Sequence, residues 1–341
     1  MADRILEVEN LSVEIPLPAG MLRPVQNVTF SVERGKTLCI VGESGCGKSL
    51  TSLSLMNLLP KVASRRADKL QLAGIDMMGL TERQMSDLRG NRIAMIFQEP
   101  MTSLNPTFTI GNQLEEALRR HKPVSRQEAR DRAVHLLERV GITGAAGRLG
   151  QYPHQLSGGL RQRVMIAMAL MCGPDLVLAD EPTTALDVTI QAQILHLLAE
   201  LQREFDMGMI LITHDLGIVA RVADRVAVMY AGQVVEEGPA EQIFNRPIHP
   251  YTQGLLGCIP IPGQTRRGEH LGAIPGIVPS LIGEIQGCHF ASRCDYATDI
   301  CRDEPIHLRA SDDTDHRYRC VLLPDESAEN YQRTGTRMEP A

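Results

Sequence analysis

Residues 42–49 have the types and spacing of a loop that binds phosphate. They run from Gly42 to Ser49 as glycine, four residues, glycine, lysine and serine, between an apolar stretch and a helical pattern. Glycines let backbone N–H groups converge on phosphate oxygens, and a helix N-terminus adds partial positive charge. We expect Lys48 to reach the β- and γ-phosphates of a nucleotide and the Ser49 hydroxyl to bind Mg²⁺. The residues predicted to hold the phosphates are Gly42, Glu43, Ser44, Gly45, Cys46, Gly47, Lys48, Ser49 and Leu50. The alternative is a chance glycine turn before a helix.

Polar side chains also follow three apolar stretches of strand length. Gln98 follows 93–97, Asp180 and Glu181 follow 176–179, and His214 follows 209–213. In parallel α/β sheets the functional residues lie at the carboxyl ends of the strands, which is where these residues are expected. Asp180 is predicted to hold Mg²⁺, through water, and Glu181 to orient and polarise an attacking water. An ordinary acidic loop is the alternative for this pair.

A second candidate anion site lies at 156–159, which reads Leu-Ser-Gly-Gly and precedes a helical pattern. Ser157, Gly158 and Gly159 would then occupy a helix N-terminus and offer backbone donors to a phosphate. Because the chain already has one phosphate loop, this suggests that a second molecule completes the site. A plain helix cap would satisfy the same pattern.

The elements that would position these residues alternate between strands and helices. Residues 4–35 alternate as an antiparallel β-layer does, and the later alternation of strands with helices predicts a mostly parallel α/β sheet. Between the two halves of that sheet we expect a helical insertion, at about 99–165. Ser125 and Glu128 give it a capping-box signature. Its first residues, 99–106, carry two prolines and are predicted to form a loop.

The composition divides the chain into three parts. Proline and glycine become frequent from about residue 245, so we place a domain boundary there, between a domain at 1–245 that carries the phosphate loop and an irregular domain at 246–323 that contains the four clustered cysteines. Residues 324–341 are polar and are predicted to be a disordered tail.

Bulk properties limit the classes of function. The chain has 341 residues, 43% of them hydrophobic and 22% charged, as in a globular protein. Its net charge of −6 argues against non-specific nucleic-acid binding. No apolar stretch approaches 18 residues and no secretory signal is visible at the N-terminus. We expect the protein to stay in the cytosol and to reach a membrane only through partners.

In their order and spacing these motifs resemble those of the nucleotide-binding subunits of ATP-binding cassette (ABC) transporters, from residue 4 to about 245. The resemblance implies a P-loop ATPase core with a RecA-like sheet and an antiparallel β-layer. It also implies that two subunits hold ATP head to tail, so that Lys48, Ser49 and Gln98 of one face Ser157, Gly158 and Gly159 of the other. Ser49, Gln98 and Asp180 would surround Mg²⁺, and His214 would contact the γ-phosphate. Asp187, in the segment 185–187, would link the two sites.

A narrower resemblance, to the dipeptide and oligopeptide importer branch, extends to about residue 320. It rests on stretches such as 97–106, 152–155, 179–193, 249–252 and 275–279. It implies an ATPase on the cytoplasmic face of the bacterial inner membrane, with two transmembrane permease subunits, a second ATPase subunit and an extracytoplasmic binding protein. Related importers carry nickel, glutathione or antimicrobial peptides, so these substrates stay open. A soluble ABC ATPase acting on ribosomes or DNA is an alternative, as is a metal-containing regulatory module.

Four cysteines cluster near the C-terminus, at Cys288, Cys294, Cys301 and Cys320. The paired spacing of a zinc knuckle is absent, whereas a four-cysteine [4Fe–4S] centre is chemically compatible. Tails of this kind in the peptide-importer branch are associated with such clusters. Zinc, or no metal, remains an alternative.

Two further positions carry expectations. Cys46 is interpreted as a small tolerated side chain, with a redox-sensitive thiol as the alternative, because a helix N-terminus lowers a thiol pKa. The family that this chain resembles usually has an aromatic residue near position 15, and that residue stacks on adenine. This chain has Ile15 there. Weaker discrimination between bases is the expected result.

Overall fold

The computed structural model describes residues 3–183, 187–259, 273–311 and 315–334. The chain divides into two compact units, which we describe separately. The first unit comprises residues 1–6, 32–36 and 71–212, and the second comprises 7–31, 37–70 and 213–341.

The first unit is built on three parallel strands in the order β9–β8–β7. Their bounds are Ile93–Ile96 for β7, Leu176–Asp180 for β8 and Gly208–Ile212 for β9. All residues of these strands are buried. Continuous burial is typical of a parallel sheet that is covered on both faces. It explains why these strands are continuous apolar runs in the sequence. Helix α8, Val188–Glu204, connects β8 to β9.

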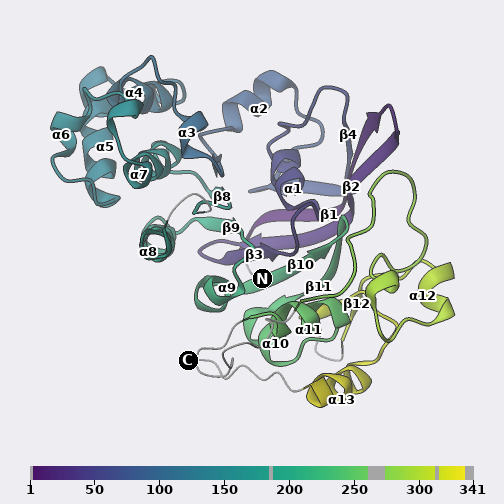
Figure 1. Ribbon diagram of the computed structural model, residues 1–341. Coiled ribbons are helices and arrows are strands. Elements are labelled where there is room, and N and C mark those ends of the chain that lie inside the picture. Colours follow the sequence, from purple (N-terminus) through teal and green to yellow (C-terminus); the bar gives the residue numbers. More distant parts are fainter. Residues whose placement is uncertain (1–2, 184–186, 260–272, 312–314, 335–341) are drawn as a thin grey trace. The chain divides into compact units, whose positions relative to one another are not determined.

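A group of helices in the same unit forms the predicted insertion (Figure 1). These helices are α3 (Pro100–Ser103), α4 (Ile110–Arg119), α5 (Arg126–Arg139), α6 (Ala145–Arg148), η1 (Pro153–Gln155) and α7 (Gly158–Ala169). The capping box of Ser125 and Glu128 starts α5 as predicted. The expected loop at 99–106 contains a single helical turn, α3, because Pro100 is compatible with the first position of a helix. The unit also contains β6 (Ile75–Asp76) and α2 (Glu82–Leu88).

The second unit contains most of the antiparallel layer. Strands β1 (Arg4–Leu17) and β2 (Gly20–Glu33) are neighbours, separated by two residues. Strand β4 (Ser64–Arg66) pairs antiparallel with β1, and β5 (Lys69–Leu72) belongs to the same sheet. This is the β-layer that the alternation at 4–35 predicts.

A second sheet of this unit has the strand order β12–β13–β11–β10–β3. Strands β3 (Thr37–Val41) and β10 (Arg225–Tyr230) are parallel, and β11 (Gln233–Pro239) is antiparallel to β10. Strand β13 (Arg317–Tyr318) pairs antiparallel with β11, and β12 (Arg309–Ala310) pairs antiparallel with β13 and forms the edge. The helices of the unit are α1 (Lys48–Leu55), α9 (Leu216–Val222), α10 (Ala240–Asn245), α11 (Pro250–Gly257), η2 (Ala291–Arg293), α12 (Asp299–Asp303) and α13 (Pro324–Thr334).

The C-terminal segment is continuous with this unit. Strand β13 pairs with β11, and the Arg319 amide donates to the Val235 carbonyl at 2.8 Å, so backbone hydrogen bonds cross the composition change near residue 245. The boundary placed there remains a prediction from composition. It does not mark a break in packing.

Residues 324–334 differ from the sequence expectation, because they form helix α13 where disorder was predicted. The Leu323 amide donates to the Glu326 carboxylate, and Ser327 is 1% exposed. The Ser327 hydroxyl donates to the Ile248 carbonyl and accepts from the Gln253 side chain. These tertiary hydrogen bonds stabilise a polar helix that composition alone does not favour. Residues 335–341 lie outside the described part of the chain.

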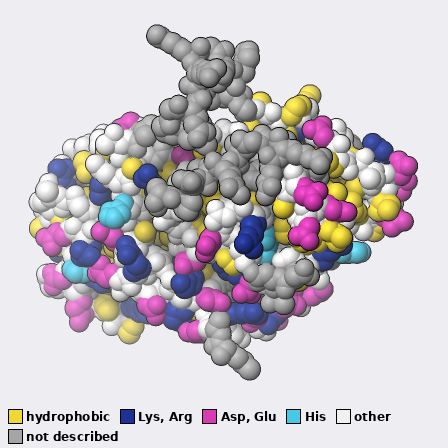
Figure 2. Space-filling model, turned by 90° about the horizontal axis from the view of Figure 1, so that it is seen from below, with side chains coloured by type: hydrophobic (Ala, Val, Ile, Leu, Met, Phe, Trp, Pro, Cys, Tyr) yellow, Lys and Arg dark blue, Asp and Glu magenta, His cyan; other side chains and the backbone are white. Residues whose placement is uncertain are grey.

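No helix in the described residues is both long and apolar enough to cross a membrane. On the face shown in Figure 2, acidic and basic side chains of the described residues are interspersed. Mixed charges of this kind produce a weak net field on that face.

Candidate active site

The phosphate loop lies between buried strand β3 and helix α1, which begins at Lys48 as the sequence predicts. Two of its glycines are required by backbone geometry. Gly42 has φ +150°, and a Cβ there would lie 2.1 Å from the Met229 carbonyl oxygen. Gly47 has φ +103°, and a Cβ there would lie 2.0 Å from the Pro24 carbonyl oxygen. Any side chain at either position would therefore displace the loop.

Lys48 is folded into the loop, with only 5% of the residue exposed. Its Nζ donates to the carbonyl oxygens of Gly42, at 2.8 Å, and Glu43, at 3.0 Å. Phosphate oxygens could replace these two acceptors, since an ammonium group has three donors and a charge to offer. The geometry of Lys48 is thus suited to the predicted phosphate contact.

Cys46 is fully buried beside Lys48. Burial raises the pKa of its thiol, and the nearby Lys48 ammonium lowers that pKa by less than burial raises it. The helix-terminus argument for a reactive thiol therefore fails at this position, because desolvation is the larger effect. The structure favours a small packed side chain.

Glu181, the predicted catalytic carboxylate, directly follows strand β8 and contacts Gln98. The Gln98 Nε2 donates to the Glu181 Oε2 at 3.2 Å, and the Glu181 amide donates to the Ile212 carbonyl at 3.0 Å. The backbone of Glu181 has φ +43°, a left-handed conformation that is uncommon for residues other than glycine. Such outliers cluster at functional sites. Asp180, which precedes it, is 5% exposed.

The predicted second anion site has the expected local structure. Ser157 is the N-cap of α7, and its hydroxyl accepts from the Leu160 amide at 3.4 Å. Gly158 and Gly159 form the first residues of that helix. Ser157 and Gly158 are exposed, so the helix N-terminus is open to a partner.

Two other predicted residues lie next to helix starts. His214 is exposed between β9 and α9, where Asp215 caps α9 by accepting from the Ile218 amide. Asp187 caps α8 by accepting from the Ile190 amide at 3.0 Å. Residues 185 and 186 of the expected linking segment lie outside the described residues.

The predicted residues therefore fall into two sets. The second unit holds the phosphate loop and His214, whereas the first unit holds Gln98, Ser157, Asp180 and Glu181. Within the first unit the structure brings Gln98 and Glu181 into contact, which sequence spacing alone does not reveal.

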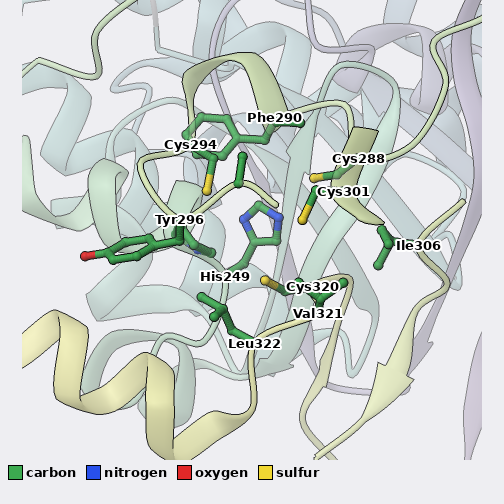
Figure 3. A pocket seen from close by; sticks show the side chains of 13 residues that line it. His249, Cys288, Phe290, Cys294, Tyr296, Cys301, Ile306, Cys320, Val321 and Leu322 are labelled. Atoms are coloured by element: carbon green, nitrogen blue, oxygen red, sulfur yellow. The ribbon is translucent and has the colours of Figure 1, made fainter. Parts of the chain in front are cut away.

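The four C-terminal cysteines line one pocket, although they are spread along the sequence from Cys288 to Cys320. Figure 3 shows their sulfur atoms directed toward the region occupied by the His249 ring. His249 is 1% exposed, and its Nδ1 accepts from the Tyr251 amide at 3.0 Å. Burial lowers the pKa of His249 to about 3, so the ring is neutral and its Nε2 carries the proton. That Nε2 is buried and has no hydrogen-bond partner among the described residues.

The donor set of this pocket suits a four-thiolate centre, but the arrangement is not that of a metal site. Burial raises the thiol pKa of Cys288, Cys294 and Cys320, to about 11 for Cys294 and about 12 for Cys320. A metal ion would therefore have to displace thiol protons. Among the described residues no three His, Cys, Asp or Glu side chains are grouped closely enough to hold a metal ion. The unpartnered His249 Nε2–H is a donor that a bound anionic centre could satisfy.

Sequence reasoning missed Arg293 and the role of Tyr251, both of which contact the phosphate loop. Arg293 forms an ion pair with Glu43, and the Tyr251 hydroxyl accepts from the Glu43 amide. Tyr251 lies in the stretch 249–252 that carries the narrower resemblance. Arg293 is next to Cys294, and no sequence signal singles it out.

Two family models match the chain. The ABC transporter model matches residues 25–184, and the model of the oligopeptide/dipeptide transporter C-terminal region matches residues 235–301. The first covers the phosphate loop and Asp180-Glu181, and the second covers three of the four clustered cysteines.

Curated relatives match over most of the chain. The dipeptide transport ATP-binding protein DppD of Bacillus subtilis is 49% identical, covering 98% of this chain and 98% of the relative. DppD of Escherichia coli is 50% identical, and the match covers 88% of this chain and 91% of the relative. The oligopeptide transport ATP-binding protein OppD of Bacillus subtilis is 49% identical, with 94% and 90% covered.

Solved structures share the fold over a smaller part of the chain. A dimeric, post-hydrolysis structure of the ATP-binding cassette MJ0796 bound to ADP and Pi has a TM-score of 0.61 and 26% identity. It matches 69% of this chain and 98% of that one. CbiO1 of Clostridium perfringens, part of the ABC transporter complex cbiONQ, has a TM-score of 0.60 and 26% identity, with 71% and 91% covered.

Proposed function

This chain belongs to the ATP-binding subunits of ABC transporters, and on that premise we propose that it hydrolyses ATP to drive the import of di- and oligopeptides. The observation that carries the proposal is the contact of Glu181 with Gln98 at the end of buried strand β8, in a chain with a complete phosphate loop. The two dipeptide transport relatives, each about half identical to it, supply the substrate class.

The chain's own residues divide the chemistry between them. Lys48 binds the β- and γ-phosphates by exchanging its two loop carbonyls for phosphate oxygens. Glu181 orients and polarises the attacking water, and Gln98 fixes the carboxylate of Glu181 through their hydrogen bond.

Ser49, Gln98 and Asp180 would hold Mg²⁺, since hydroxyl, amide and carboxylate oxygens are the ligands that this ion prefers. When bound, the ion supplies positive charge that neutralises the phosphates.

A second ATPase subunit completes each site in this proposal. Ser157, Gly158 and Gly159 present an open helix N-terminus that suits a phosphate on a partner's nucleotide. His214 contacts the γ-phosphate, and Asp187 links the two sites. The dimeric state of the MJ0796 cassette supports the pairing.

We infer the partners and the location from membership of the family. Two transmembrane permease subunits receive the motion of the ATPase pair, and an extracytoplasmic binding protein delivers the peptide. The chain then works on the cytoplasmic face of the bacterial inner membrane. Nickel, glutathione and antimicrobial peptides are the competing cargoes.

The test is uptake of a labelled dipeptide by cells that lack other peptide importers and carry either this protein or its Glu181→Gln form. We expect Glu181→Gln to reduce ATP turnover at least about 100-fold, because it removes the group that activates water, while ATP affinity changes little. Peptide uptake should stop with it. Glu82→Gln, which neutralises an exposed carboxylate that pairs with Arg89, is the matched control.

Wild-type hydrolysis by the Glu181→Gln form would overturn the catalytic role. Uptake of nickel but not of peptide, with ATP hydrolysis intact, would overturn the assignment of peptide as the substrate and leave the ATPase assignment standing.

We also propose that Cys288, Cys294, Cys301 and Cys320 bind a [4Fe–4S] cluster. Support comes from the four thiols that line one pocket and from the unpartnered His249 Nε2–H beside them. A bound cluster would cross-link the C-terminal segment, and ATP hydrolysis needs no electron carrier from it.

The cluster proposal is tested on full-length protein purified without oxygen. Analysis should find about four iron and four acid-labile sulfide atoms per chain, the composition of such a cluster. Zinc in place of iron would replace the cluster with a zinc site. Protein free of both metals would overturn the metal proposal altogether.

A further inference from the structure

Glu43, the second residue of the phosphate loop, is held by all three of its polar groups. Its amide donates to the Tyr251 hydroxyl at 2.9 Å, and its carbonyl accepts from Lys48 Nζ at 3.0 Å. Its carboxylate accepts two hydrogen bonds from the Arg293 guanidinium, at 2.6 and 3.0 Å. Two of these three partners belong to the C-terminal segment, and all four residues lie in the second unit.

Arg293 is itself fixed by the C-terminal segment. Its side chain is 3% exposed, and it also donates to the carbonyls of Ile274, at 2.9 Å, and Pro275, at 2.8 Å. The guanidinium lies over the rings of Tyr230 and Phe290, at 5.6 and 5.9 Å from their centroids. A guanidinium held on so many sides has little freedom, so it sets the position of the Glu43 carboxylate.

Tyr251 is equally constrained. Its ring packs against those of Tyr230 and Phe290, with centroids 4.6 and 5.4 Å away. The hydroxyl that accepts from the Glu43 amide is therefore mounted on a rigid aromatic cluster.

We propose that Arg293 and Tyr251 are positioning residues for ATP binding, which act by fixing the backbone and the charge of Glu43. The inference rests on the proposed function. Fixing the Glu43 backbone through its amide reduces the conformational freedom that the loop would lose when ATP binds. Pairing the Glu43 carboxylate with Arg293 neutralises a negative charge that otherwise lies in the loop that receives the phosphates. Both effects favour the binding of ATP.

The experiment measures binding of a fluorescent ATP analogue to the full-length chain. Arg293→Ala should raise Kd about tenfold or more, because it leaves the negative charge of Glu43 unpaired in the loop that receives the phosphates. In the permease complex the same variant should raise KM for ATP with kcat little changed. Arg302→Ala, which removes an exposed arginine that pairs with Asp299 in α12, is the matched control and should bind like wild type.

A double variant separates charge from general damage. Arg293→Ala combined with Glu43→Gln removes both members of the pair, so ATP affinity should recover to within about threefold of wild type. A merely structural role for Arg293 predicts no such recovery.

If Arg293→Ala does not fold, as judged by thermal unfolding, Tyr251→Phe provides the test. It deletes only the hydroxyl, and its Kd should rise several-fold. A folded Arg293→Ala or Tyr251→Phe protein with wild-type Kd would overturn the inference. Failure of the wild-type chain to bind ATP would instead overturn the proposed function, so the two failures are distinguishable.

Discussion

The phosphate loop and the cysteine pocket differ in how the protein satisfies their polar groups. In the loop, Lys48 Nζ donates to the carbonyls of Gly42 and Glu43, although the ammonium is almost fully buried. In the pocket, His249 Nε2 is buried with no partner in the described part of the chain, beside four thiols. Leaving a buried polar atom unpaired costs about 1–3 kcal/mol.

This difference indicates two ways of preparing a site. In the loop, the Lys48 ammonium is paired internally before a ligand binds, and in the proposed function phosphate oxygens replace those two carbonyls. The pocket carries an unsatisfied donor and thiols whose pKa is raised, both of which a bound centre would relieve. Arg293, which pairs with Glu43, is next to Cys294 in the sequence but does not line the cysteine pocket.

The largest expected effect concerns the pocket alone. Cys320→Ser should abolish most of the iron bound by anaerobically purified protein, because one of four thiolate ligands is lost. ATP affinity should stay within about twofold, a difference of less than 0.5 kcal/mol. Iron analysis and nucleotide titration on the same sample provide the check.

Cys258→Ser is the control for that variant, since Cys258 does not line the pocket. A large loss of ATP affinity in Cys320→Ser would contradict the independence of the two regions.

A smaller effect is expected from breaking the loop. Lys48→Ala should raise Kd for ATP about 10- to 100-fold, because charge-assisted hydrogen bonds are worth about 1.5–3 kcal/mol. Iron content should not change. Nucleotide titration checks the prediction, with Lys61→Ala, at an exposed lysine, as the control. Unchanged affinity in Lys48→Ala would place the nucleotide elsewhere.

The smallest effect concerns the base of the nucleotide. Position 15 is Ile15, which is 7% exposed in β1 and has no ring to stack on adenine. Stacking on a base is worth about 1–3 kcal/mol, so Kd values for ATP and GTP should differ by less than about tenfold. Parallel titrations with the two nucleotides measure this ratio. A preference for ATP above about 100-fold would show that other groups recognise the base.

The sequence predicted the backbone structure around most of the proposed nucleotide-binding residues, because that structure is local. A run of eight residues specifies the loop, in which Gly42 and Gly47 occupy positions that admit no Cβ. Ser157 begins α7 because its own hydroxyl caps that helix. Glu181 follows a fully buried strand, a pattern that apolar runs reveal directly.

The same local reasoning failed where desolvation or distant partners decide the outcome. The Cys46 thiol was compatible with activation by a helix terminus, but burial raises its pKa. Residues 324–334 are polar enough to predict disorder, yet the Ser327 hydroxyl donates to the Ile248 carbonyl and accepts from the Gln253 amide, and these bonds hold a helix there. Neither environment can be read from neighbouring residues in the chain.

By itself, then, the sequence determined the phosphate loop, the helix starts and the alternation of buried strands with helices, because these depend on backbone sterics and on residues within a few positions of one another. Only the tertiary structure decided that Arg293 pairs with Glu43, 250 positions away, and that four cysteines face one pocket with His249. Such contacts depend on which distant segments the sheet and its edge strands bring together, and no local spacing specifies them.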